Sequence, residues 1–373
     1  MDLFNVYSLF NVTPATAHGC TIVDNKGHEY LDMYAGHAVV NIGHNHPKYV
    51  SAVTEQAKQL TYCGTSMDNP LQKKLAERLG KMSGYSDYSL FLCNTGAESV
   101  ENALKIASFH TGRQRVIAFK RSYHGRTSGA AAVTDNPSIQ SLYNRVHKVV
   151  FVELNDIATL TRELETQKVA AVIIEGIQGT GGVHTPSKDF MLQMENLCHK
   201  TGTVLILDEV QSGYGRTGKF FAHQWAGIKP DLICIGKPMA NGLPCGGVMI
   251  APQFEAVRGR YGTTFGGNHL TMAAANSVLE VLEEDKLMAN ALAMGEFLKE
   301  HIPASPRIKD VRGKGLMIGI EFREPVAPIR QKLLAEKHVI TGSAGMNVIR
   351  LLPPLCITQQ ECYAFINALK SVL

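Results

Sequence analysis

Two side chains suited to covalent or acid–base chemistry follow buried strands of the predicted sheet. Asp208 ends the apolar run at residues 204–207, and Lys237 follows the apolar run at residues 232–235. Apolar runs without helical or alternating periodicity are typical of strands buried on both faces of a parallel sheet. Because ligands of open α/β sheets bind beyond the carboxyl ends of the strands, we expect this acid and this lysine to face one ligand.

A third strand end offers a site for an anion. Thr95 and Glu98 follow the strand predicted at residues 89–93 and have the spacing of a capping box, which by itself indicates only a stable helix start. The segment Thr95-Gly96-Ala97 also suits a phosphate, because glycine lets backbone N–H groups approach and a helix N-terminus favours negative charge. The two interpretations are compatible.

Aromatic, basic and acidic side chains follow two further strands. Tyr123 can stack on a planar ring and Arg126 can hold a carboxylate with two hydrogen bonds, although a solvated loop is the more common role of such a sequence. Glu175 ends the strand predicted at residues 169–175, before a glycine-rich loop that includes Thr180. That loop either allows a ligand to approach closely or is a simple turn.

A lysine, an acid, a stacking ring and an anion site are the four groups that pyridoxal phosphate chemistry requires. The lysine holds the cofactor aldehyde as a Schiff base, and the carboxylate keeps the pyridine nitrogen protonated. Lys237, Asp208, Tyr123 and Thr95 offer these groups at four separate strand ends.

Two other motifs suggest ligands that their context argues against. The loop at residues 213–219 matches both GxGxxG and GxxxxGK. The second motif fails because Phe220 stands where a phosphate-binding loop needs Ser or Thr. The first fails because a dinucleotide site needs an acid at the end of the next strand, whereas Asp231 begins its strand. We therefore prefer an active-site loop shaped by glycine. His44 and His46 have no Cys or carboxylate nearby at metal-ligand spacing, so we favour a helix-entry turn and expect no metal.

Composition and charge favour a small-molecule partner. The chain has 373 residues, 45% of them hydrophobic, and a net charge of +4, the difference between 37 Lys and Arg and 33 Asp and Glu. No basic block indicates nucleic-acid binding, and no apolar run reaches the ~18 residues of a membrane span. Eight cysteines without a CxxC pair and an N-terminus without a signal-peptide pattern favour reduced thiols and the cytoplasm.

The alternation of strands and helices predicts an α/β fold. Helices are expected at residues 48–60 and 70–82, and the region from about 89 to 251 alternates in a way that indicates a largely parallel sheet covered by helices. After residue 268 we expect two long helices, a strand pair at 308–322, a helix, a strand at 347–352 and a closing helix. The strands of the large sheet are expected at residues 89–93, 116–119, 149–152, 169–175, 203–208, 231–235 and 247–251.

Taken in order, these motifs resemble the class III aminotransferases of pyridoxal phosphate fold type I, closest to the acetylornithine and succinylornithine aminotransferases. The similarity covers nearly the whole chain, and its most specific part is Asp208-Glu209-Val210-Gln211 with Lys237. The resemblance implies a large domain with a mostly parallel seven-stranded sheet covered by helices, and a smaller α+β domain made from both termini. We expect an N-terminal arm or part of the small domain at 1–45, the large cofactor-binding domain at 46–267 and the C-terminal small domain at 268–373. The other matching motifs begin at Gly27, Gly43, Asn94, Tyr123 and Ile349.

The resemblance also implies how the cofactor is held. Lys237 would bond its aldehyde carbon and then carry the proton between substrate and cofactor, and Asp208 would pair with the pyridinium nitrogen. Gln211 would contact the phenolic oxygen and Tyr123 would stack on the ring. One phosphate-binding threonine would come from the neighbouring subunit, so a homodimer with shared active sites is implied. The cofactor-binding residues are then Thr95, Gly96, Ala97, Tyr123, Asp208, Gln211, Lys237 and the partner-supplied Thr264.

The implied reaction is ping-pong transfer of the δ-amino group of an N-acylornithine to 2-oxoglutarate, which gives the N-acylglutamate semialdehyde and glutamate in arginine biosynthesis. Arg126 matches the arginine that holds a substrate carboxylate, and Arg350 matches the one that binds 2-oxoglutarate or glutamate. Tyr7, Glu175 and Thr180 complete the implied substrate-binding set.

Thr180 departs from the family pattern, in which a glutamate at this position pairs with the C-terminal arginine. Arg350 would then lack a carboxylate partner, and an unpaired, partly desolvated arginine favours an anionic ligand. We therefore hypothesise that the acyl group of the substrate carries its own carboxylate, as in N-succinylornithine.

Several alternatives remain open at this point. They are an ornithine or 4-aminobutyrate aminotransferase and an aminomutase of the same fold, which the sequence separates poorly. A nucleotide-binding ATPase or dehydrogenase conflicts with the failed glycine motifs. A non-catalytic protein of this fold would be expected to lose Lys237 or Asp208.

Overall fold

The computed structural model describes residues 1–373 and contains three β-sheets. The largest has seven strands in the spatial order β4-β10-β9-β8-β7-β5-β6. Only β10 runs antiparallel to its neighbours, so the predicted mostly parallel seven-stranded sheet is confirmed. The strands are β4 (Ser89–Cys93), β5 (Arg115–Phe119), β6 (Val149–Val152), β7 (Val169–Glu175), β8 (Val204–Asp208), β9 (Leu232–Ile235) and β10 (Gly246–Ile250).

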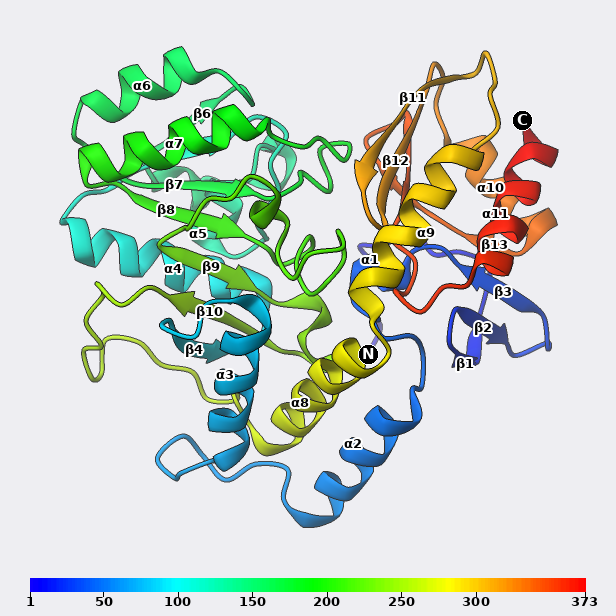
Figure 1. The fold of residues 1–373 in the computed structure, drawn as a ribbon, viewed down its shortest axis with the longest axis horizontal. Coiled ribbons are helices and arrows are strands. Elements are labelled where there is room, and N and C mark those ends of the chain that lie inside the picture. The colour runs from blue at the N-terminus through cyan, green and yellow to red at the C-terminus, as the bar shows by residue number, and fades with distance from the viewer.

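Helices cover both faces of this sheet (Figure 1). On β7, Val172 and Ile174 pack in a cluster with α6 (Ile157–Glu165) and α7 (Lys188–Thr201). Ala171 and Ile173 point to the opposite face and pack with α4 (Gly96–Thr111) and α5 (Ser128–Ala132). Every residue of β7 is buried as a result, which explains its continuous apolar sequence.

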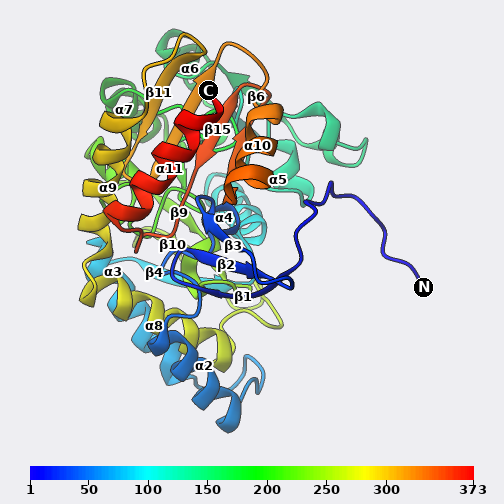
Figure 2. The same ribbon diagram turned by 90° about the vertical axis from the view of Figure 1, so that its right-hand side faces the viewer.

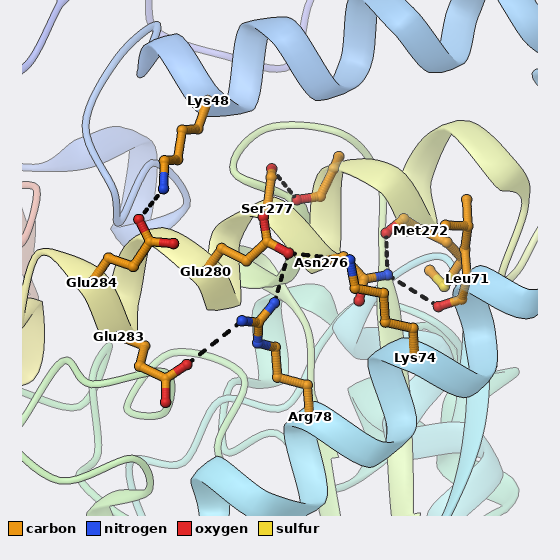
Figure 3. A network of polar contacts seen from close by, with 11 residues as sticks. Lys48, Leu71, Lys74, Arg78, Met272, Asn276, Ser277, Glu280, Glu283 and Glu284 are labelled. Atoms are coloured by element: carbon orange, nitrogen blue, oxygen red, sulfur yellow. Dashed lines mark hydrogen bonds and ion pairs between the residues drawn. The ribbon is translucent and has the colours of Figure 1, made fainter.

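Helices α3 (Pro70–Ser83) and α8 (His269–Glu284) extend the layer of α6 and α7. They share a cluster with Ile233, whose register partner Leu207 packs with α7, so both pairs of helices lie on one face. Figure 3 shows how polar contacts attach α3 and α2 (Pro47–Gln59) to α8. Arg78 of α3 donates to Glu280 at 2.6 Å, and Lys48 of α2 pairs with Glu284.

Two smaller sheets combine segments from both ends of the chain. In one, β1 (Pro14–His18), β2 (Thr21–Asp24) and β3 (Glu29–Asp32) form an antiparallel meander, and β13 (Val339–Ile340) pairs in parallel with β3. The other has the order β11-β12-β15-β14, with β11 (Ile308–Lys314), β12 (Met317–Phe322), β14 (Gly342–Ala344) and β15 (Val348–Leu351). The division at residues 45 and 267 stays a prediction.

The remaining helices are α1 (Ala35–Ala38), α9 (Leu287–His301), α10 (Ala327–Lys337) and α11 (Gln359–Val372). Short 3₁₀ turns lie at η1 (Pro137–Ile139), η2 (Asn144–Val146), η3 (Ala222–Trp225) and η4 (Lys237–Ala240). None of the helices combines the length and the hydrophobicity needed to cross a lipid bilayer. Figure 2 shows the N-terminal segment before β1 projecting from the body of the molecule.

The histidine motif is a helix-entry turn, as expected. Helix α2 begins at Pro47, directly after His46. His44 instead makes a 2.8 Å contact with Asp32, and this contact connects the turn to the end of β3.

The glycine loop at residues 213–219 is a packing element, so our preference for an active-site loop was wrong. Arg216 and Tyr214 are fully buried, and Arg216 donates to the backbone oxygens of Leu316 and Pro353. Gly215 and Gly218 have φ values of +83° and +90°, and a Cβ at either would press against α9. The glycines therefore allow close contact between the loop and α9.

Candidate active site

Three neighbouring strand ends bring two acids and a lysine together. Glu175 ends β7, its register partner Asp208 ends β8, and Lys237 follows β9 as the first residue of η4. β7, β8 and β9 are consecutive and parallel, so their carboxyl ends meet at one edge. The structure thus places Asp208 and Lys237 as the strand pattern predicted.

Asp208 is held by a histidine that the sequence analysis did not select. The Nδ1 atom of His124 lies 2.7 Å from Oδ2 of Asp208, and the backbone N–H of Val210 donates to Oδ1 at 3.0 Å. His124 is buried, and its Nε2 atom has no hydrogen-bond partner. Its position directly after Tyr123, in the loop after β5, is the signal that could have identified it.

Glu175 organises backbone at the site. Its carboxylate accepts hydrogen bonds from the N–H groups of Tyr123, at 3.0 Å, and Gly179, at 2.9 Å. Burial raises the pKa of Glu175 to about 7, with Asp208 adding to the rise and His124 and the two N–H groups opposing it. Glu175 thus connects the loop that carries Tyr123, the predicted stacking residue, to the glycine-rich loop at Gly179.

The Lys237 amine is poised as a nucleophile. Burial lowers its pKa and Arg350 adds to this effect, while Asp208 and Glu175 act in the opposite direction. The residue keeps partial exposure and forms no ion pair. A lysine with a lowered pKa has a larger fraction of neutral amine, the form that attacks a carbonyl carbon.

The helix start after β4 forms an anion cradle. The Thr95 hydroxyl caps α4 by accepting from Glu98 N at 3.1 Å, while the Glu98 carboxylate accepts from Asn94 N at 2.7 Å. The first N–H groups of the helix, at Gly96 and Ala97, have no helical partners. A Cβ at Gly96 would lie 2.5 Å from Val210, so the glycine lets the cradle approach the end of β8.

Arg350, on β15, reaches the same site from the second small sheet. It is buried, donates to Gln211 Oε1 at 3.1 Å and to the Tyr34 hydroxyl at 2.6 Å, and contacts no carboxylate. Gln211 also donates to the backbone oxygen of His37 at 3.3 Å. Tyr34 and His37 were missed in the sequence, because their segment has no periodic pattern.

The other predicted residues are exposed or only partly buried. Tyr123 and the exposed Thr180 line a cavity of about 560 Å³, and Arg126 is exposed. Thr264 is exposed in a loop beside the anion cradle, where the neighbouring Thr263 accepts from Asn94 Nδ2 at 3.1 Å. Tyr7 is 76% exposed in the N-terminal segment and is not brought into contact with the others.

These residues fit pyridoxal 5′-phosphate. The Lys237 amine has no ion-pair partner and lies near the buried Asp208. The N-terminus of α4 approaches the end of β8, because Gly96 has no Cβ that would press against Val210. A phosphate and a protonated ring nitrogen are the groups that such a cradle and such an acid would hold.

Comparisons with known proteins agree with this geometry. The family "Aminotransferase class-III" matches residues 5–373. The acetylornithine aminotransferases of Bacillus cereus and Bacillus subtilis are each 38% identical over 100% of this chain and 97% of their own length. An ornithine aminotransferase structure from Toxoplasma gondii superposes with a TM-score of 0.93 at 29% identity, covering 99% of this chain and 92% of that one. The chain therefore belongs to the class III aminotransferases, pyridoxal phosphate-dependent transaminases of fold type I.

Proposed function

We propose that this transaminase transfers the δ-amino group of an N-acylornithine, N-acetyl- or N-succinylornithine, to 2-oxoglutarate, within arginine biosynthesis. The products are the N-acylglutamate semialdehyde and glutamate. The observation that carries the proposal is the Lys237 amine, which has no ion-pair partner and is influenced by the charges of buried Asp208 and Arg350. The acetylornithine aminotransferases among its relatives support the choice of donor.

When bound, the cofactor supplies an electron sink for the carbon that carries the amino group. Asp208, oriented by His124, would hold the proton on the ring nitrogen. Thr95, Gly96 and Ala97 would hold the phosphate, and Tyr123 would cover the ring face.

Lys237 Nζ is the atom that would move the proton to and from the substrate carbon. Its lowered pKa suits both directions of transfer, because a base works best when its pKa lies nearer to the operating pH. Gln211 would contact the phenolic oxygen through the amide N–H that does not donate to His37, while its amide oxygen accepts from Arg350.

Two arginines would bind carboxylates in turn. Arg126 at the exposed rim would hold the donor's α-carboxylate, and buried Arg350 would hold a carboxylate of 2-oxoglutarate or glutamate. Thr180 and Glu175 would complete the pocket. Tyr7 would join them only if the N-terminal segment, where it is exposed, moved against an active site. Arg350 contacts no carboxylate, which is the state that our N-succinylornithine hypothesis requires.

We further propose a homodimer in which Thr264 serves the partner's phosphate site. Large apolar side chains that are exposed on the single chain are candidates for burial at such an interface. They include Leu3, Phe4, Leu9, Phe10, Met67 and Phe265. The eight free cysteines support a reducing compartment such as the cytoplasm.

Half-reactions test the donor. Purified enzyme, loaded with cofactor, is mixed with N-acetylornithine, N-succinylornithine, ornithine or 4-aminobutyrate, and the loss of visible absorbance is followed. We expect the acylornithines to react fastest and 2-oxoglutarate to restore the colour. Faster turnover of ornithine or 4-aminobutyrate would favour those aminotransferases. Repeated turnover of the donor to an isomeric amino acid without 2-oxoglutarate, beyond one equivalent per site, would indicate an aminomutase. A clearly higher kcat/KM for N-acetylornithine than for N-succinylornithine would refute the N-succinylornithine hypothesis and leave the assignment as an N-acylornithine aminotransferase intact.

A further inference from the structure

The Arg350 guanidinium is a buried cation with neutral partners only. Its two contacts are the Tyr34 hydroxyl and the Gln211 amide oxygen, and its Nε atom has no partner. Leaving a buried cation without a counter-charge is costly, so the guanidinium favours an anion. An anion that binds Arg350 must displace one of these neutral partners, so the strength of that contact affects the affinity for the anion.

Tyr34 is oriented by a second contact. Its hydroxyl lies 2.6 Å from Nδ1 of His37, and the two rings meet edge to face at 4.7 Å. Burial lowers the pKa of His37, and Arg350 and Lys237 lower it further, which favours a neutral imidazole whose Nδ1 can accept a hydrogen bond from the Tyr34 hydroxyl. The oxygen of Tyr34 then presents its lone pairs to Arg350, and the three groups form one directed chain of hydrogen bonds.

The backbone that carries this pair is strained. Ala35, Gly36, His37 and Ala38 have φ values of +46°, +56°, +71° and +64°, so α1 is a left-handed turn. L-residues rarely adopt consecutive left-handed conformations, and such outliers persist mainly where the surroundings enforce them at functional sites. Asp32 enforces this one by accepting from the N–H groups of Tyr34 and Ala35 at 2.9 and 2.8 Å.

The Tyr34 ring is also closely packed. A Cβ at Gly342, the register partner of Arg350 on β14, would lie 1.9 Å from the ring. Only glycine at that position leaves room for the ring beside the arginine. Backbone strain, ring packing and hydrogen bonding therefore agree in holding the Tyr34 hydroxyl against the guanidinium.

We propose that Tyr34, positioned by His37, is the reversible partner of Arg350 and a specificity-determining residue of the transaminase. Its hydroxyl binds Arg350 while a donor whose acyl group has no carboxylate, such as N-acetylornithine, reacts, and it gives way to a carboxylate of the five-carbon dicarboxylate acceptor. Because this partner is neutral, its departure leaves no unpaired negative charge in the pocket. The inference rests on the proposed role of Arg350 as the carboxylate site.

The test is binding of glutarate, a five-carbon dicarboxylate that cannot react, to the holoenzyme by isothermal titration calorimetry. Tyr34→Phe removes the competing hydroxyl and keeps the ring, so we expect glutarate to bind about 10- to 100-fold more tightly, as one hydrogen bond to a charged group would give. KM for 2-oxoglutarate should fall by a similar factor, and KM for N-acetylornithine should change less. His37→Gln, a second variant that disturbs only the orientation of Tyr34, should shift glutarate affinity in the same direction by a smaller factor.

Two comparisons make the outcome decisive. Tyr30→Phe removes another buried hydroxyl, one that donates to Asp24 and does not contact Arg350, and it should leave glutarate affinity unchanged. Arg350→Gln should weaken glutarate binding strongly. If it does, but Tyr34→Phe leaves binding unchanged or weaker, Tyr34 does not compete with the ligand and the inference is wrong. If Arg350→Gln has no effect, the proposed carboxylate role of Arg350 fails first.

Discussion

At the scale of single residues, the site depends on a few buried titratable groups whose environments differ. His124 and Asp208 form a buried pair, Glu175 accepts from two backbone N–H groups, and Lys237 has no ion-pair partner. The acid and the lysine were predictable, because each follows an apolar strand. Their neighbours were not, because the contact between His124 and Asp208 joins residues 84 positions apart.

The Asp208–His124 pair predicts the effect of His124→Phe. The substitution removes the 2.7 Å contact and frees the carboxylate to turn away from the ring nitrogen. We expect kcat/KM to fall about 10- to 100-fold, which corresponds to the ~1.5–3 kcal/mol typical of a hydrogen bond to a charged group. Steady-state kinetics at saturating cofactor measure this. A variant with normal kcat/KM and an unchanged unfolding temperature would show that Asp208 needs no orienting partner.

Lys237→Ala should abolish turnover, because the Lys237 amine, beside Asp208 and Glu175, is the group that would bond the cofactor aldehyde and move the proton. The measurement is a single-turnover assay with N-acetylornithine in the presence of added cofactor. Lys219→Ala, which removes an amine that instead donates to the backbone oxygen of Gln224, serves as the control and should retain activity. Normal turnover by the Lys237 variant would contradict the whole assignment.

The raised pKa of Glu175 predicts a pH-dependent stability. The pKa of Glu175 is about 7 in the folded protein and 4.5 in the unfolded chain. Between these pH values the carboxyl is therefore protonated in the folded state and ionised in the unfolded state. The stability from this group is therefore complete below about pH 4.5 and is lost as pH rises through 7, by about 3 kcal/mol at most.

Urea unfolding of the apoprotein at pH 5 and pH 8 measures this loss. Glu175→Gln cannot titrate, so its free energy of unfolding should fall less between the two pH values than that of the wild type. The exposed Glu77→Gln is the control and should follow the wild type. Equal pH dependence in all three proteins would rule out a raised Glu175 pKa.

At the scale of elements, the seven strands of the large sheet start and end within one residue of their predicted positions. Long apolar runs and clear turn residues explain that accuracy. β13 and β14 were missed because two or three residues carry no recognisable period. The left-handed turn α1 was missed because its conformation depends on hydrogen bonds that its backbone N–H groups donate to Asp32, and its own sequence carries no signal for it. The loop at 213–219 was misjudged because its glycines serve packing against α9.

That packing predicts different costs for two glycines of similar backbone conformation. Gly218 has φ +90° and a Cβ there would lie 2.9 Å from Leu292, whereas Gly227 has φ +81° and open space around it. Both alanine variants should lose the ~1 kcal/mol of a left-handed non-glycine residue, and Gly218→Ala should lose ~1–3 kcal/mol more from overpacking. Thermal unfolding of the two variants gives the difference. Equal losses would show that α9 moves aside freely.

At the scale of the whole molecule, the proposed sharing of Thr264 between subunits predicts complementation. Each of two variants should be inactive by itself. Lys237→Ala removes the catalytic amine, and Thr264→Glu places a carboxylate that repels the cofactor phosphate. If Thr264 acts across the interface, a mixed dimer of the two variants has one site with both defects and one with neither. Unfolding and refolding the mixture should then restore up to about a quarter of wild-type activity, since random pairing makes half of the dimers mixed. Activity no higher than the sum of the separate variants would show that Thr264 acts within its own chain.

The pairing of β3 with β13 has a consequence for how the protein is made. The meander of β1, β2 and β3 leaves the ribosome long before the strand that completes its sheet, which lies at residues 339–340. Contacts so distant in sequence close late, because the loop between them must first be ordered. The N-terminal meander therefore waits through most of translation with one edge open, and that edge is where a chaperone or a premature partner strand would bind.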